Sequence, residues 1–222
     1  MIHKPTEIMR KPLLLLIFLI GILASCGKKS KSPKVHMVAA AKTRDNSTAG
    51  NTKTILLLPL GDFPKSDASL LLQRLRAVCD NVRLLPAEPI PRSAWYNPRK
   101  RYRADSLIQW MARRAGSGQV YIGITAQDIS TTKNGHADWG VMGLGFQPGK
   151  ACVASFHRLH ARNRQDEFFK VAIHELGHTA GLPHCPERTC FMRNAEGGNP
   201  TGEEKEFCKN CREKLVAEGW RL

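Results

Sequence analysis

The stretch HELGHTAGLPHC, residues 174–185, constrains the fold of this 222-residue chain more than any other. Histidines at positions i and i+4 of a helix project from one face, so His174 and His178 can share a metal ion. Gly181 tolerates positive φ and permits a sharp turn after the helix. That turn brings His184 back towards the first two imidazoles, so the helix must end at a defined place.

The residue types in this stretch predict a particular chemistry. Three neutral imidazoles leave the fourth position of a tetrahedral zinc ion open for water. Zinc lowers the pKa of that water towards about 7 and polarises a carbonyl oxygen. HExxHxxGxxH therefore predicts a catalytic zinc on His174, His178 and His184, with Glu175 as the general base of peptide hydrolysis. A bare HExxH is less specific, because a structural helix can carry it by chance.

Four cysteines follow in two pairs, Cys185 with Cys190 and Cys208 with Cys211. Such spacings are typical of a structural zinc site with four thiolate ligands, closed to water. Neighbouring side chains of an extended segment point to opposite sides, so His184 can face one ion while Cys185 faces another. The second ion would then pin the loop that carries the third histidine. Disulfides are the alternative, because the N-terminal leader implies an oxidising compartment.

That leader has the three parts of an export signal. Basic residues precede an apolar run of 14 residues, 12–25, which is too short for a comfortable membrane span. The run continues into LASC (23–26), which resembles a bacterial lipobox. We therefore predict a signal peptide over 1–25 and lipidation of Cys26 at the cell envelope. Gly27 follows in place of an inner-membrane retention signal, which favours the outer membrane, at its periplasmic or surface face. A plain secretory signal or a short retained anchor is the alternative.

Composition separates a tether from a folded domain. Residues 26–53 are rich in Lys, Ser, Thr and Asn and predict a flexible tether, whereas 54–222 are expected to fold. The net charge is +15, and removal of the leader takes away three basic residues and one acidic residue and leaves +13. Such a charge favours polyanions, but we interpret its main clusters, 28–34 and RKRYR (99–103), as solvated segments. No specific nucleic-acid partner is predicted, since no basic pattern interleaved with aromatic residues appears.

Apolar periodicity predicts an α/β domain. We expect helices over 66–79, 104–116 and 165–181, and strands over 54–60, 81–86, 119–129, 140–146 and 151–157. Strands that alternate with helices imply crossover connections and a mainly parallel sheet. The Pro-rich stretch 86–98 and the polar stretch TTKNGHADWG (131–140) are interpreted as loops. Cys79 and Cys152 are interpreted as buried thiols, or as a disulfide if they meet.

HELGHTAGLPHC, CFM (190–192) and CKNC (208–211) together resemble the archaemetzincin family, also called archaelysins. The resemblance extends from about residue 54 onward. It implies a metzincin-like α/β (α+β) fold, with a twisted, mixed, mainly parallel sheet, an active-site helix and a small zinc-bound C-terminal subdomain. It also implies one catalytic zinc on the three histidines and one structural zinc on the four cysteines.

Other parts of the family pattern carry over to single positions. The resemblance implies that Met192 packs beneath the catalytic site and that an edge strand, here GVMGLGF (140–146), pairs with the substrate backbone. Fifteen residues separate Met192 from Cys208, a little fewer than is usual in the family.

These observations predict a membrane-anchored, monomeric zinc peptidase that acts on peptide or protein substrates. The alternative is a zinc-stabilised lipoprotein that binds a peptide or a polyanion without turnover, as the basic charge suggests. Glu175 favours the enzyme, because a binding protein has no use for a base beside the metal. No carboxylate that could hold a substrate amine, as an aminopeptidase needs, can be placed from the sequence.

Overall fold

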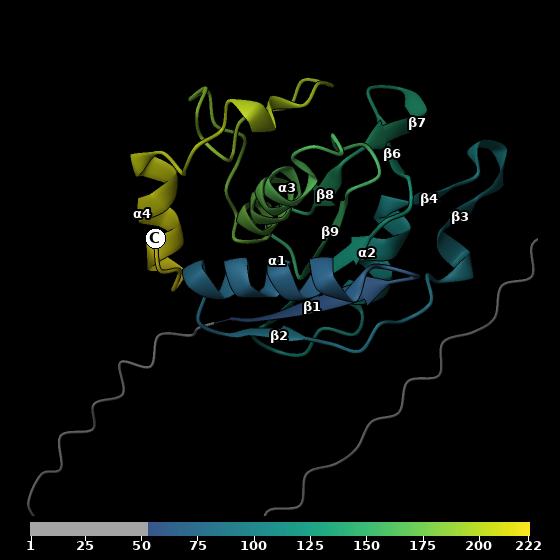
Figure 1. Ribbon diagram of the computed structural model, residues 1–222, viewed down its shortest axis with the longest axis horizontal. Coiled ribbons are helices and arrows are strands. Elements are labelled where there is room, and N and C mark those ends of the chain that lie inside the picture. Colours follow the sequence, from purple (N-terminus) through teal and green to yellow (C-terminus); the bar gives the residue numbers. More distant parts are fainter. Residues whose placement is uncertain (1–52) are drawn as a thin grey trace, which may run out of the picture. The chain divides into compact units, whose positions relative to one another are not determined.

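The computed structural model describes residues 53–222 (Figure 1). The predicted signal peptide 1–25, the predicted lipidation site Cys26 and nearly all of the predicted tether 26–53 lie outside the described residues. Within the described part, no helix is both long enough and apolar enough to cross a bilayer.

The main sheet has five strands in the order β2-β1-β5-β9-β8. β1 (Thr54–Leu60) pairs in parallel with β2 (Val82–Leu84) and β5 (Gln119–Thr125). β5 pairs in parallel with β9 (Ala151–Ser155), and β8 (Gly143–Gly145) closes one edge antiparallel to β9. Four parallel strands with one antiparallel edge strand confirm the predicted mixed, mainly parallel sheet.

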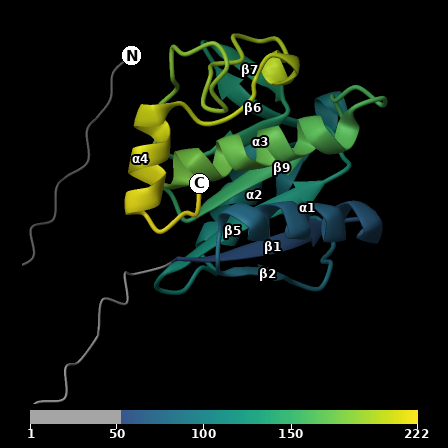
Figure 2. The same cartoon turned by 60° about the vertical axis from the view of Figure 1, so that its left-hand side comes forward.

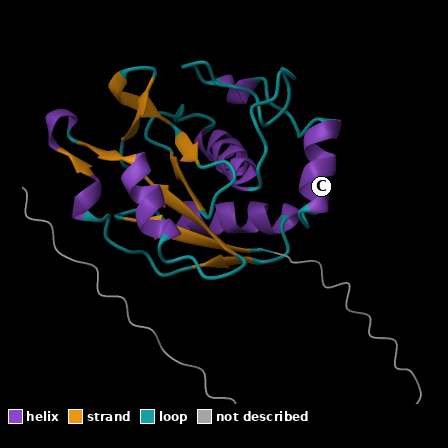
Figure 3. Cartoon of the chain, turned by 180° about the vertical axis from the view of Figure 1, so that it is seen from behind, coloured by secondary structure: helices purple, strands orange, loops and turns teal. Residues whose placement is uncertain are grey.

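Helices cover both faces of this sheet. α1 (Lys65–Val78) and α3 (Arg164–Thr179) lie on one face, and α2 (Ala104–Ala112) lies on the other (Figures 1 and 2). From behind, α2 lies in front of the strands (Figure 3). Side chains alternate along a strand, so Leu57 packs in the core with α1 and α3, whereas Leu58 packs in the core with α2. All three predicted helices are present, within a few residues of their predicted ends.

A second sheet corrects two predictions. Its order is β3-β4-β6-β7, and its strands are β3 (Trp95–Tyr96), β4 (Arg101–Arg103), β6 (Ile129–Lys133) and β7 (His136–Val141). β3 lies within the segment 86–98 that was predicted to be a loop.

The basic cluster RKRYR (99–103) is not wholly solvated, because the side chains of Arg101 and Arg103 are only 16% and 17% exposed. They form ion pairs with Asp128 and Asp138, so these arginines neutralise half-buried carboxylates.

The polar stretch 131–140 is a β-hairpin and not a loop. β6 and β7 pair antiparallel around a turn at Asn134 and Gly135, whose φ values are 48° and 80°. Asn-Gly suits such a turn, because both central residues take positive φ. This dipeptide was the signal that could have predicted the hairpin.

The C-terminal region forms the expected small subdomain. Its regular elements are the short helix η3 (Pro200–Gly202) and α4 (Lys209–Ala217), which lies near one end of α3 (Figure 2). Leu215 of α4 is fully buried in the core shared with α1 and α3. Trp220 forms an antiparallel bridge with Cys79, which ties the C-terminus to the end of α1.

Candidate metal centres and active-site cleft

The three histidines predicted as metal ligands converge at the C-terminal end of α3. Their candidate ligand atoms all lie within 4.8 Å of one another. The Nε2 atoms of His174 and His178 are 3.0 Å apart. The ring of His184 lies 4.8 Å from that of His178 and 5.5 Å from that of His174, between centroids. Gly181, with φ of 91°, makes the turn that returns His184 to the helix.

Hydrogen bonds determine which ring nitrogens can bind a cation. Nδ1 of His174 lies 2.6 Å from the carbonyl oxygen of Phe191, and Nδ1 of His178 lies 2.8 Å from that of Leu182. A carbonyl oxygen can only accept, so both Nδ1 atoms carry hydrogen and both Nε2 atoms present lone pairs. Two such acceptors 3.0 Å apart repel each other unless they share a cation. Nitrogen ligands of a tetrahedral zinc lie about 3.4 Å apart, so the donor set fits zinc.

Burial sets the protonation of this centre. It lowers the pKa of His174 to about 3, and it also lowers the pKa values of His178 and His184. The three rings are therefore neutral near pH 7, which is the form that binds metal. Burial also raises the pKa of Glu175 to about 8. A dication bound beside Glu175 would favour its carboxylate form.

Glu175 and the histidines line a cleft of about 570 Å³, and edge strand β8 forms part of its wall. A Cβ atom at Gly143 would lie 2.5 Å from Glu175 Oε1, and one at Gly145 would lie 2.7 Å from the Glu175 carbonyl oxygen. The two glycines therefore allow β8 to lie directly against Glu175. Within the described chain, one side of β8 has no strand partner.

The sequence did not predict the other walls of the cleft. The β6–β7 hairpin contributes Lys133 and Trp139, and the segment 193–204 contributes several residues, including the buried Glu204. His136, also in the hairpin, is exposed and does not line the cleft. The Asn-Gly turn could have indicated the hairpin, but no local pattern indicates that segment 193–204 returns to the histidines.

Met192 has the packing position that the family pattern implies. Its side chain is fully buried. A Cβ atom at Gly177 would overlap the Met192 sulfur. Because Gly177 lies between His174 and His178 on α3, Met192 packs directly against the part of the helix that bears these two histidines.

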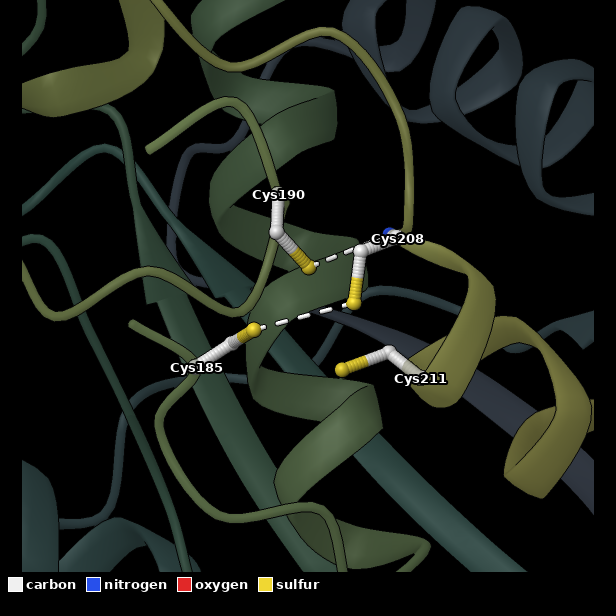
Figure 4. A group of neighbouring side chains, drawn as sticks. All are labelled: Cys185, Cys190, Cys208 and Cys211. Carbon is white, nitrogen blue, oxygen red and sulfur yellow. Dashed lines mark hydrogen bonds between the residues drawn. The ribbon is translucent and has the colours of Figure 1, made fainter. Parts of the chain in front are cut away.

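The four cysteines also converge (Figure 4). Their sulfur atoms lie within 4.8 Å of one another; Cys185 and Cys190 follow α3, whereas Cys208 and Cys211 begin α4. The sulfurs of Cys185 and Cys208 are 3.7 Å apart, well beyond the ~2.05 Å of a disulfide. Two thiolates on a tetrahedral zinc lie about 3.8 Å apart, so this donor set also fits zinc. All six cysteines in the described part of the chain, including the buried Cys79 and Cys152, are free thiols.

Backbone hydrogen bonds connect the two centres. The N–H of Cys185 donates to the carbonyl oxygen of Met192 over 2.8 Å, and the N–H of Met192 donates to the sulfur of Cys190 over 3.5 Å. Between these residues, the carbonyl oxygen of Phe191 accepts the bond from His174. One short segment thus carries a candidate cysteine ligand and also orients a histidine of the other centre.

Comparison with known sequences agrees with this geometry. The family model described as Peptidase family M54 matches residues 112–217. An archaemetzincin from Natronomonas pharaonis is 30% identical over 177 residues, which are 72% of this chain and 98% of that protein. An archaemetzincin from Haloquadratum walsbyi is 31% identical over 175 residues, which are 72% of this chain and 97% of that protein.

Solved structures share the fold. The crystal structure of archaemetzincin from Archaeoglobus fulgidus, complexed with malonate, matches with a TM-score of 0.63 and 25% identity, and the match covers 72% of this chain and 99% of that one. Archaemetzincin from Methanopyrus kandleri matches with a TM-score of 0.63 and 24% identity over 75% of this chain and 96% of that one. The predicted metzincin-like fold is confirmed. The chain belongs to the archaemetzincin family and is a zinc metallopeptidase.

Proposed function

We propose that this peptidase binds its catalytic zinc through His174, His178 and His184 and uses Glu175 as general base. The proposal rests on the Nε2 atoms of His174 and His178, which lie 3.0 Å apart in the cleft that Glu175 lines. Backbone carbonyl oxygens bind the Nδ1–H groups of both rings, so both Nε2 atoms present lone pairs to the cleft. When bound, zinc lowers the pKa of a water ligand and polarises the carbonyl of the scissile bond.

Glu175 carries the proton in this proposal. Its carboxylate accepts a proton from the attacking water and returns it to the amide nitrogen of the leaving group. Glu175 is only 7% exposed, so few bulk water molecules compete for that proton. The three neutral imidazoles supply no proton of their own, because each ring binds metal through a lone pair.

β8 is the proposed binding strand for the substrate backbone. It is an edge strand, and residues 143–145 lie against Glu175 and line the same cleft. An extended peptide that adds to such an edge forms main-chain hydrogen bonds and takes a defined register. Pairing with β8 would hold the scissile carbonyl beside Glu175.

The four cysteines are proposed to bind a second, structural zinc. Its role would be to hold Cys185 and Cys190, and through them the adjacent His184 and the segment that accepts the hydrogen bond of His174. Two ions per chain, one in each centre, are therefore expected in metal analysis of the purified monomer.

The catalytic proposal is tested by Glu175→Gln in zinc-loaded protein, assayed on a broad peptide library. Loss of a general base costs about 10²- to 10⁴-fold in rate. Zinc content must remain that of the parent protein, and Glu206→Gln, which makes the same charge change at an exposed residue outside the cleft, is the matched control. Equal cleavage by the Glu175→Gln variant would remove Glu175 from the mechanism.

We further propose that the domain 54–222 is held at the cell envelope by lipidated Cys26, after removal of residues 1–25 and through the tether 26–53. The support is the lipobox-like LASC after a basic and apolar leader. The test is metabolic labelling with an alkyne fatty acid, followed by membrane fractionation of the protein and its Cys26→Ser variant. Label on the variant, or its unchanged recovery with membranes, would contradict the proposal.

A further inference from the structure

A second carboxylate lines the active-site cleft. Glu204 is only 4% exposed, and it borders the same cleft as His174 and Glu175. Of the described residues that line this cleft, Glu175 and Glu204 are the only acidic ones. Since Glu175 is assigned to proton transfer, Glu204 has no role in the chemistry described above.

The carboxylate of Glu204 has no partner within residues 53–222. No described group donates a hydrogen bond to it or forms an ion pair with it. The cationic side chains that act electrostatically on Glu204 are those of Lys170 and Arg193. Lys170 donates instead to the carbonyl oxygen of Thr201 over 2.8 Å and pairs with an acidic residue of α3. Arg193 donates to Glu203 over 2.8 Å.

The position of Glu204 is well defined by its neighbours. The side chain of Asn199 accepts hydrogen bonds from the N–H and the hydroxyl of Thr201 over 3.2 and 2.7 Å. The N–H of Glu204 donates to the carbonyl oxygen of Pro200 over 3.3 Å. These bonds and the contact of Lys170 with Thr201 hold the backbone that carries Glu204 against α3.

A buried, unpaired carboxylate is costly, and a cation of the ligand can offset that cost. Burial raises the pKa of Glu204 to about 7, which reflects the same lack of a direct partner. An ammonium or guanidinium group that entered the cleft would supply the missing donors and the opposite charge.

We propose that Glu204 is a specificity-determining residue whose carboxylate binds a cationic group of the substrate peptide. The group is either the α-ammonium at the peptide N-terminus or the side chain of a Lys or Arg residue. This inference rests on the proposed peptidase function, because the occupant of the cleft is taken to be a peptide.

The experiment measures binding without turnover, in the zinc-loaded full chain that carries Glu175→Gln. Four probes are titrated by calorimetry, all with amidated C-termini. The first pair is pentaalanine with a free and with an acetylated N-terminus. The second pair is acetylated pentapeptides with a central Lys or a central norleucine.

Glu204→Gln in this background is expected to weaken binding of the cationic member of one pair by roughly 10- to 100-fold, the usual range for a charged hydrogen bond. Affinity for its neutral partner is expected to stay unchanged, which also shows that the variant is folded. Glu204→Asp keeps the charge and should retain part of the preference for the cationic probe. It keeps the inference testable if the Glu204→Gln variant does not fold. Glu206→Gln, an exposed control outside the cleft, should change nothing.

The two pairs distinguish the source of the charge. A loss confined to the free N-terminus assigns Glu204 to the α-ammonium, and a loss confined to the central Lys assigns it to a side chain. An unchanged preference in both pairs, or an equal loss for cationic and neutral probes, overturns the inference. Cleavage of a peptide library by the parent protein is scored separately, so failure of the peptidase proposal cannot be mistaken for failure of this one.

Discussion

The histidine centre and the cysteine centre are neighbours in the sequence but differ in construction. Two of the three histidines lie on α3, a helix of 16 residues whose other side is packed into the core. The cysteines come from a segment with few regular elements and from the first turn of α4. The histidine centre opens into a cleft, with His184 exposed, whereas Cys190 and Cys211 are buried.

This difference predicts which centre would depend on a bound metal for its structure. Packing of α3 places His174 and His178 whether or not an ion is present. The segment that follows α3 has few regular elements and packs into the core through only a few side chains, such as Met192, so we expect a bound ion at the four sulfurs to stabilise it. The histidine centre is therefore suited to chemistry with an open position, and the cysteine centre to holding the chain.

The largest effect is expected from Cys211→Ser. Loss of one thiolate should release the structural ion and lower the free energy of unfolding by several kcal/mol, since structural zinc contributes about 10 kcal/mol or more in small domains. Thermal unfolding and zinc content measure the effect. Cys79→Ser, at a buried thiol outside the cluster, is the matched control and should keep both ions. A Cys211→Ser variant that keeps two ions and the parent melting temperature would show that the two centres do not differ in this way.

His184→Ala should produce the opposite pattern. Peptidase activity should fall by roughly 10³-fold or more through loss of the catalytic ion. The free energy of unfolding should change by less than about 1 kcal/mol, because His184 is exposed and α3 does not depend on it. Denaturant unfolding beside the activity assay checks both parts. A stability loss as large as that of Cys211→Ser would contradict the proposed division.

Acid should affect the two centres unequally. Burial raises the pKa of Cys190 to about 11 and raises that of Cys211 as well, so near pH 7 both metal-free thiols hold protons that zinc must displace. The pKa values of the three histidines are lowered, so their rings are already deprotonated there. From pH 8 to 6, zinc affinity should fall at least about 100-fold per pH unit at the cysteines and less than about tenfold per unit at the histidines.

Competition with a chelator of known affinity at several pH values measures these slopes. In the His184→Ala variant, the measured zinc affinity is that of the cysteine centre alone. The difference between the parent protein and this variant then gives the zinc affinity of the histidine centre. Equal slopes at the two centres would mean that the thiols are ionised before metal binds.

The smallest effect is expected from Gly143→Ala, which tests how closely β8 must lie to Glu175 in the wall of the active-site cleft. The added Cβ would lie 2.5 Å from Glu175 Oε1, so either β8 or the Glu175 side chain must shift. We expect a loss of about 1–2 kcal/mol in stability and roughly tenfold in kcat/KM, with both ions retained. Gly202→Ala is the control, because no atom lies within 4 Å of its added Cβ. An unchanged kcat/KM would show that β8 need not lie close to Glu175.

The parts of the site that the sequence predicted are those encoded by short spacings. His174 and His178 are one helical turn apart, Gly181 makes the turn, and Cys208 and Cys211 are close enough to bind one ion from a single helix start. Strand β1 and helix α3 were predicted nearly to the residue, because apolar periodicity follows directly from backbone geometry. The candidate metal ligands and the strands of the main sheet could therefore be predicted before any tertiary structure was known.

Tertiary structure alone decided what surrounds the ligands. The hairpin wall with Trp139, the ion pair of Arg101 with Asp138, and the place of Glu204 in the same cleft as His174 all join residues far apart in the sequence. No periodicity encodes such contacts, because they depend on how separately folded elements pack. The ligand spacings determined that this chain can hold zinc, and packing decided which side chains a substrate meets beside it.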